Sequence, residues 1–103
     1  MSPKPPYYAA IFTSTKTGNR SGYAAMAKAM EELAKKQPGF LGMETAQEQM
    51  GITVSYWENL EAMAQWKSQA DHQFAQQQGK NVWYSWYKVR ICRVEREYEF
   101  TQP

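Results

Sequence analysis

A chain of 103 residues with 43% hydrophobic side chains is long enough to bury the core of one domain and too short to bury two. The 12 basic and 10 acidic residues are interspersed and leave a net charge of +2, without the basic stripe of a nucleic-acid-binding protein. No segment approaches the roughly 18 apolar residues of a membrane span, and the chain starts without a signal-peptide pattern. We therefore expect a cytoplasmic protein that binds neither nucleic acid nor membrane.

The prolines near the start predict that residues 1–6 form a disordered lead-in and that residues 7–103 form a single domain. Aromatic residues make up 15% of the chain, which is more than a minimal core needs. Large aromatic side chains gather in cores, interfaces and apolar pockets, so the surplus indicates a cavity or a subunit interface. The one cysteine, Cys92, allows no intrachain disulfide, and its apolar setting predicts a buried, unreactive thiol.

The first half of the domain predicts a strand followed by a helix. Residues 7–14 are rich in aromatic and β-favouring side chains, which is typical of a buried strand. Apolar residues then recur at the helical period over 23–34, and Asn19 or Ser21 is a suitable N-cap for this helix. The sequence Gln-Pro-Gly at 37–39 should end the helix, because proline cannot continue it.

Residues 40–48 and 52–59 predict two strands, joined by a tight turn in which Gly51 supplies a positive φ. A second helix should follow, so that the remaining elements repeat the order of the first half.

Several local signals mark out this last part of the chain. Asn59 is a suitable N-cap for the second helix, and Asp71 is a suitable cap for a further short helix that ends at Gly79. Residues 81–86 fit either a last helical turn or an entering strand. Residues 87–100 alternate between apolar and polar side chains, which predicts one long final strand.

The order strand, helix, strand, strand, helix, strand predicts an α+β fold of the ferredoxin-like type, an antiparallel sheet with helices on one face. Apolar residues at alternate positions suggest that both sheet faces are apolar. We expect Val89 to share one face with Ile11 and Val54, and Cys92 to share the other with Phe12 and Trp57. An exposed apolar sheet face is usually an interface, so we expect a homodimer that packs sheet against sheet.

Four segments of the chain resemble the antibiotic biosynthesis monooxygenase (ABM) family. In chain order they are PGFLGMET (38–45), GITVSYWENLEAMAQW (51–66), DHQFAQ (71–76) and WYSWYKVRICRVEREY (83–98). Each motif is short, and their combination at this spacing covers about residues 7–98. The resemblance therefore points to the fold more strongly than to any one reaction.

This resemblance implies a homodimer whose two sheets form a dimeric α/β barrel, with a pocket in each subunit between helices and sheet. The family includes cofactor-independent monooxygenases that oxidise phenolic polyketides to quinones, haem-degrading monooxygenases and many members of unestablished activity. The expectation is an oxidoreductase that oxidises a small aromatic or polyketide-like substrate with O₂ in an apolar pocket, with no metal and no flavin. A haem-binding or haem-degrading enzyme and a non-catalytic dimeric ligand-binding module are the alternatives.

Cofactor-free oxidation asks for aromatic walls, a few hydroxyls and one base, because a deprotonated phenol or enol can react with O₂. His72 is the only histidine and has a suitable imidazole for the base, and Trp66 is the second expected catalytic residue. The expected substrate-binding residues are Phe12, Ser14, Tyr56, Trp57 and Phe74.

Structural interpretations compete with these roles. Trp66 lies on an apolar helical stripe, where a core tryptophan is the default, and His72 near a helix start could face solvent. The aromatic residues of 83–87 could pack a dimer interface. For haem degradation, Trp66 and His72 match the family's Trp and His by order, but the expected Asn of the first strand is absent, where Thr13 and Ser14 stand. One His and one Cys do not suffice for a zinc site.

Overall fold

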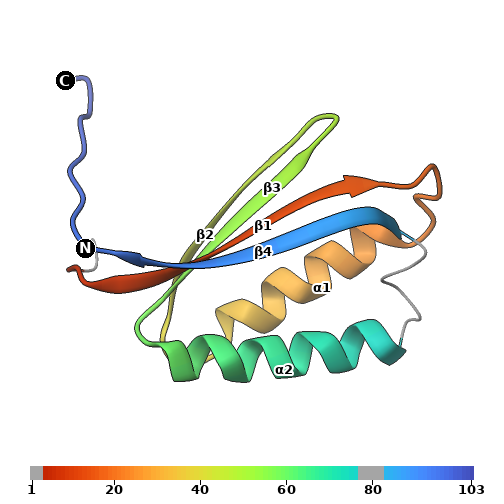
Figure 1. Cartoon of the computed structure of the whole chain (residues 1–103), viewed down its shortest axis with the longest axis horizontal. Helices are drawn as coiled ribbons and strands as arrows, with labels where there is room; N and C mark the ends of the chain where they lie inside the picture. The colour runs from red at the N-terminus through yellow and green to blue at the C-terminus, as the bar shows by residue number, and fades with distance from the viewer. Residues whose placement is uncertain (1–3, 77–82) are drawn as a thin grey trace.

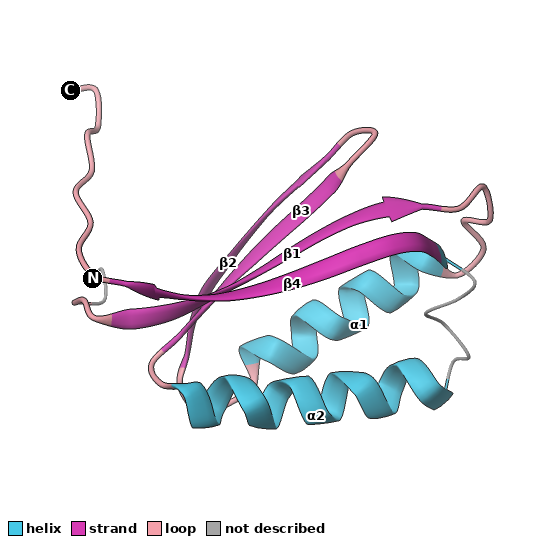
Figure 2. Cartoon of the chain, in the orientation of Figure 1, coloured by secondary structure: helices cyan, strands magenta, loops and turns pink. Residues whose placement is uncertain are grey.

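Strands and helices follow one another in the predicted order. The computed structural model describes residues 4–76 and 83–103, and the side chains of residues 72–76 lie outside the description. The elements are β1 (Tyr7–Lys16), α1 (Tyr23–Lys35), β2 (Phe40–Gln47), β3 (Gly51–Trp57), α2 (Leu60–Gln76) and β4 (Tyr84–Val94). The strands form one antiparallel sheet in the order β2-β3-β1-β4, and both helices lie on the same side of it (Figure 1, Figure 2). The predicted ferredoxin-like α+β fold is confirmed.

Helix α1 has the predicted apolar stripe but a different start. Its buried residues are Met26, Met30 and Ala34. The expected N-cap at Asn19 or Ser21 is wrong, because Gly22 occupies the cap position in a left-handed conformation and no side chain caps the first turn. The Asn19 side chain instead accepts a hydrogen bond from the Ser21 N–H at 3.0 Å, within the preceding loop.

The end of α1 and the start of α2 meet at Gly39. This residue has a φ of 86°, and a Cβ atom built on it would lie 2.7 Å from the Cβ of Ala62. The Glu58 N–H donates to the Gly39 carbonyl at 2.8 Å, and this hydrogen bond links the loop between α1 and β2 to the loop between β3 and α2. The predicted N-cap of α2 is confirmed, since the Asn59 side chain accepts from the Ala62 N–H at 2.8 Å.

Two local predictions between β2 and the end of α2 are wrong. Gly51 is a residue of β3 and does not have a positive φ. Its lack of a side chain leaves room for the Gln47 amide, because a Cβ atom added at Gly51 would be 2.7 Å from the Gln47 amide oxygen. Helix α2 is continuous through Asp71, which pairs with Lys67 one turn earlier at 2.9 Å instead of capping a new helix. The expected helix end at Gly79 lies outside the described residues.

Strand β4 is shorter at its end than the alternation over 87–100 predicts. It lies at the edge of the sheet and pairs only with β1, whose first residue, Tyr7, is opposite Val94. Beyond Val94 the described part of the chain offers no neighbouring strand, and residues 95–103 leave the sheet and extend away from the helices (Figure 1). The predicted strand is confirmed up to Val94 and wrong beyond it.

Strand pairing decides which side chains face the helices. Val89 is opposite Phe12 and shares its face, because directly opposed residues point to the same side of a sheet. Cys92 is opposite Ala9 on the face that no helix covers, and it is exposed. The expected grouping of Val89 and Cys92 is therefore wrong, as is the expected burial of the Cys92 thiol.

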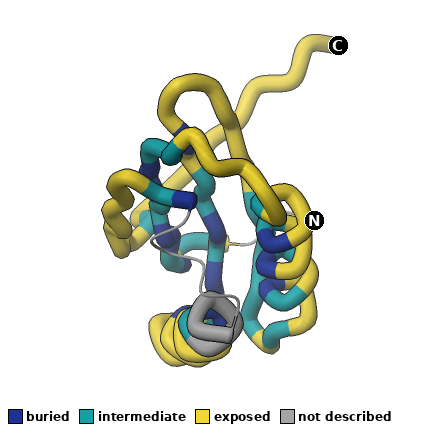
Figure 3. The backbone as a smooth tube through the Cα atoms, turned by 90° about the vertical axis from the view of Figure 1, so that its right-hand side faces the viewer, coloured by how far each residue is buried: buried dark blue, intermediate teal, exposed yellow. Residues whose placement is uncertain are grey.

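Most buried residues lie between the helices and the sheet (Figure 3). One cluster is built around Trp57, which is fully buried, and a second joins Met26 and Met30 to Trp83. Trp66 packs against both clusters. None of the described helices is long and apolar enough to cross a membrane.

We expect Gly39→Ala to destabilise the protein. The left-handed conformation costs a non-glycine residue about 1–2 kcal/mol, and the new Cβ would also meet Ala62. The free energy of unfolding, measured with urea, should fall by at least this amount. Gly18→Ala is the matched control, because nothing lies within 4 Å of a Cβ at that position. Equal stability of the two variants would contradict the prediction.

Candidate functional site

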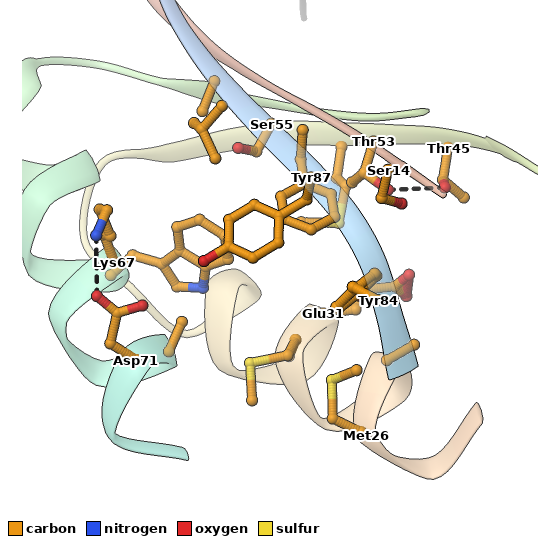
Figure 4. A pocket seen from close by; sticks show the side chains of 18 of the residues that line it. Ser14, Met26, Glu31, Thr45, Thr53, Ser55, Lys67, Asp71, Tyr84 and Tyr87 are labelled. Atoms are coloured by element: carbon orange, nitrogen blue, oxygen red, sulfur yellow. Dashed lines mark hydrogen bonds and ion pairs between the residues drawn. The ribbon is translucent and has the colours of Figure 1, made fainter. Parts of the chain in front are cut away.

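A cavity of about 480 Å³ lies between the helix-covered face of the sheet and the two helices (Figure 4). Its volume is within the range of small-molecule sites, roughly 300–1,000 Å³. Aromatic and aliphatic side chains make up most of the wall. From the sheet they are Phe12, Met43, Tyr84, Tyr87, Val89 and Ile91, and from the helices Tyr23, Met26, Met30, Met63, Trp66 and Ala70.

The polar groups of the cavity fall into two sets. Hydroxyls come from the sheet, where Ser14, Thr53 and Ser55 lie along one wall (Figure 4). Charged side chains come from the opposite side, where the Lys67–Asp71 pair of α2 contributes to the lining (Figure 4). A bound molecule would therefore meet neutral donors on the sheet and charges at the helices.

The indole of Trp66 is the most unusual polar group of the cavity. Its Nε1 is buried and has no hydrogen-bond partner within the described residues. The ring packs against Trp57, with centroids 5.3 Å apart and planes at 31°. A buried N–H without a partner costs about 1–3 kcal/mol, and nearly all such groups in proteins are satisfied. The described residues leave this N–H unsatisfied, although the Trp66 side chain itself lines the cavity.

Trp57 acts on the cavity through Ser55. The two residues are on the same face of β3, and the Trp57 indole N–H donates to the Ser55 hydroxyl oxygen at 2.9 Å. A serine hydroxyl has one proton and two lone pairs, so Ser55 keeps its own O–H for another acceptor. Trp57 thus fixes the position of Ser55 and favours its use as a donor.

Aromatic rings from three elements form the wall around Tyr84. Phe12 stacks on Tyr87 with centroids 5.2 Å apart, and it meets Tyr84 edge to face at 5.4 Å. Tyr23 of α1 lies against Tyr84 from the other side at 6.0 Å. Burial raises the pKa of Tyr84 well above its usual range, and its hydrogen bond with Tyr23 acts in the same direction. At neutral pH the Tyr84 phenol therefore keeps its proton and is unsuited to act as a base.

The structure brings some of the expected site residues together and separates others. Phe12, Ser14 and Trp66 all line the cavity. Trp57 is fully buried beneath it and does not line it, and Tyr56 lies on the uncovered face of the sheet.

The two remaining site residues belong to the second half of α2. His72 and Phe74 lie within its last turns, but their side chains are outside the described residues. His72 directly follows Asp71, which lines the cavity.

Strand β4 supplies cavity residues that the sequence did not single out. Tyr84 and Tyr87 fall in the aromatic group expected at a dimer interface, and both line the cavity instead. Val89 and Ile91 line it as well, and they are opposite Phe12 and Ala10 of β1. The sequence shows that apolar and polar side chains alternate along β4. Only the pairing of β4 with β1 determines which of these alternate side chains face the helices.

Comparison with known proteins gives the family. Residues 6–78 match the family described as antibiotic biosynthesis monooxygenase. The chain belongs to this family. It is also 46% identical over 103 residues to YqjZ, an uncharacterised protein of Bacillus subtilis, covering 98% of this chain and 90% of YqjZ.

Solved structures share the ABM fold at low sequence identity. A mutant of SnoaB, a cofactor-independent oxygenase from Streptomyces nogalater, matches with a TM-score of 0.74 and 10% identity, over 90% of this chain and 97% of SnoaB. A conserved protein from Methanosarcina mazei matches with a TM-score of 0.65 and 10% identity, over 89% and 94%. At this identity the likeness shows a common fold.

This ABM chain has a second, smaller cavity of about 350 Å³ on the uncovered face, and Tyr56 lines it. The Tyr56 hydroxyl donates to Glu44 at 2.5 Å, and the Tyr7 hydroxyl donates to Glu97. The two tyrosine rings meet edge to face at 5.9 Å. The hydrogen bond to Glu44 raises the pKa of Tyr56 to about 12, and the bond to Glu97 has the same effect on Tyr7. Two carboxylates and two phenols thus form one acidic cluster.

Tyr56→Phe should change how stability depends on pH. A phenol in the unfolded chain ionises near pH 10, whereas Tyr56 in the folded chain ionises near pH 12. Its contribution to stability is therefore complete below pH 10 and is lost as the pH rises from 10 to about 12. The free energy of unfolding of Tyr56→Phe should fall less steeply over this interval. Tyr98→Phe, at a 95% exposed residue, is the matched control, and identical slopes for Tyr56→Phe and the unchanged chain would contradict the prediction.

Proposed function

We propose that this chain is a monooxygenase that oxidises a small aromatic or polyketide-like phenol with O₂, without a metal or flavin. The observation that carries the proposal is the aromatic cavity lined by Trp66, whose buried N–H has no hydrogen-bond partner among the described residues. Membership of the ABM family and the shared fold with SnoaB, a cofactor-independent oxygenase, support it.

In the proposed reaction the substrate supplies all the electrons. A base takes the phenolic proton, and the ring carbon of the resulting anion forms a C–O bond with O₂, which is reduced to a peroxide. The O–O bond then breaks, so that one oxygen stays on the ring as the new quinone carbonyl. The other leaves as water with the former O–H and C–H hydrogens, so atoms and electrons balance without a further reductant.

The cavity suits the requirements of this reaction. Aromatic and methionine side chains bind a flat ring and keep water from the reactive anion. Negative charge develops on the phenolic oxygen, and neutral donors in a water-poor site stabilise such charge strongly. The available donors are the N–H of Trp66 and the hydroxyls of Ser55 and Ser14. None of them carries a charge that would hold the anion too tightly to react.

Two neighbouring residues of α2 are candidates for the base. We assign this role to His72, because a free imidazole has a pKa of about 6.5 and exchanges protons readily at neutral pH. Asp71 lines the cavity, but its carboxylate is held in an ion pair with Lys67 at 2.9 Å.

We further propose that the protein works as a homodimer. No described helix covers the second face of the sheet, where Ile52 is 41% and Trp86 is 44% exposed. Exposed apolar surface of this kind usually marks an interface, and a second copy of the same face is a chemically matched cover. The extended tail with Tyr98 and Phe100, at 95% and 85% exposure, also projects from this side (Figure 1).

Trp66→Phe should lower the rate of O₂ uptake with a phenolic substrate. Loss of one preorganised donor to an oxyanion lowers kcat by roughly 100- to 1,000-fold in other enzymes. We expect at least a tenfold loss here, with a smaller change in KM because the aromatic wall is kept. Uptake is measured with an oxygen electrode on a panel of hydroxynaphthalenes and anthrones, with product mass as the second readout.

The matched control is Trp86→Phe, which makes the same exchange at a residue outside the cavity. Because the variant keeps an aromatic ring on the uncovered face, dimer formation and uptake should both be unchanged. If both variants had the rate of the unchanged chain, the donor role of Trp66 would be wrong. No uptake by the unchanged chain with any substrate would contradict the oxygenase proposal. A Soret shift on adding haemin would then favour the haem alternative. The absence of both O₂ uptake and a Soret shift would favour a ligand-binding module.

His72→Ala should abolish turnover and leave folding and association intact. If the imidazole is the base, kcat of the unchanged chain should fall as the pH is lowered and the imidazole is protonated, and imidazole added to His72→Ala should restore part of the lost rate. Asp71→Asn is the comparison, and its profile should keep that acidic limb. Full activity in His72→Ala together with loss in Asp71→Asn would transfer the role to Asp71.

A further inference from the structure

Charges on the uncovered face are sorted by strand. Strand pairing places Glu44, Val54, Ile11 and Arg90 opposite one another in a single row across the sheet. Glu44 stands on the edge strand β2 and Arg90 on the edge strand β4, and both are exposed. The row thus has an acid at one end, a base at the other and two aliphatic side chains between them.

Neighbouring rows follow the same rule. Next to Arg90 on the same face of β4 stands Lys88, whose row continues through Thr13 and Ile52 to Ala46. On the β2 side, Glu44 belongs to the acidic cluster with Tyr56. Among the described strand residues of this face, negative charge is confined to β2 and positive charge to β4.

The two charges of the row do not pair within one chain. Three strand spacings separate their backbones by roughly 14 Å, and no ion pair of Arg90 is found within the described residues. Each charge therefore stands at the edge of an apolar strip without an opposite charge beside it in its own subunit.

The sorting of charges distinguishes two ways to stack a second copy. A two-fold axis that runs across the strands lays β4 over β4 and β2 over β2, so like charges meet. A two-fold axis that runs along the strands, midway between β1 and β3, lays β4 over β2. Each Arg90 then faces a Glu44, and the Val54 and Ile11 side chains of both copies meet in the centre.

We propose that a second copy of this chain packs on the uncovered face with β4 over β2, and that Arg90 of each copy pairs with Glu44 of the other. The inference rests on the proposed homodimer and specifies how its two sheets are placed. The second cavity adjoins Glu44, so a basic side chain from β4 of the second copy completes a site that is acidic in a single subunit.

The twist between stacked sheets leaves this pairing intact. Aligned sheets cross at about 30°, and a residue at the edge, about 7 Å from the axis, then moves by roughly 4 Å. An arginine side chain can span such a shift. The ion pairs lie at the rim of the apolar strip, where charges set the register of an interface more than its affinity.

Charge reversal tests the register. The dissociation constant of the dimer is measured by sedimentation velocity at low salt for Glu44→Arg, Arg90→Glu and the double variant. Symmetry repeats each contact, so each single reversal creates two like-charge contacts and should raise the constant at least tenfold. The double variant restores opposite charges and should return within about threefold of the unchanged chain. High salt should reduce the differences.

Controls separate this inference from the proposals on which it rests. Lys28→Glu makes the same type of charge reversal on an exposed residue of α1 and should leave the constant unchanged. Thermal melts confirm that every variant folds. A dimeric chain whose single reversals have no effect, or whose double variant is as weak as the singles, would overturn the register and leave the dimer standing. A monomer at all concentrations would overturn both, and oxygen uptake would still test the enzyme activity separately.

Discussion

The pairing of β1 with both of its neighbours is the constraint on which the rest of the structure depends. Among the described strands, β1 alone is bonded to two partners that are distant in sequence, β3 on one side and β4 on the other. Side chains alternate along a strand, so a shift of one residue would move every side chain to the opposite face. The present register gives Phe12 and Ser14 to the cavity and Ile11 to the uncovered face. Cavity and outer surface are thus specified by the same hydrogen bonds.

Local signals in the sequence were sufficient for the position of the helices and the order of elements, but not for the start of α1 or the continuity of α2. The stripe of α1 and the cap at Asn59 depend on residues within one or two turns, which a sequence displays directly. Which side chains of β4 face the helices depends on its pairing with β1, and the sequence alone placed Val89 and Cys92 on the wrong faces. The end of β4 at Val94 depends on where β1 begins. Adjacent strand residues such as Tyr56 and Trp57 point to opposite faces, so alternation alone already argued against placing both in one pocket.

Two polar groups of residues that line the cavity, the Ser55 hydroxyl and the Trp66 N–H, owe their position to apolar packing. Trp57 is fully buried in the core and at the same time holds Ser55 by a hydrogen bond. Trp66 packs at a tilt against Trp57, and its N–H has no partner within the part of the chain that the structure describes. A core built for stability alone would satisfy or replace that N–H, because burial without a bond is unfavourable. The proposed binding of a substrate would account for this unpaired N–H.

The edge strand β4 links this cavity to the proposed dimer. Its residues Tyr87, Val89 and Ile91 line the cavity, while Lys88 and Arg90 alternate with them on the other face. A lone edge strand bonded on one side only is the part of a sheet that opens most easily. Ion pairs with a second copy would restrain Arg90 on the uncovered face of β4. They would thereby also restrain the β4 side chains that line the cavity on the other face. Dimer formation would then matter for the substrate even though no residue of the second copy needs to reach it.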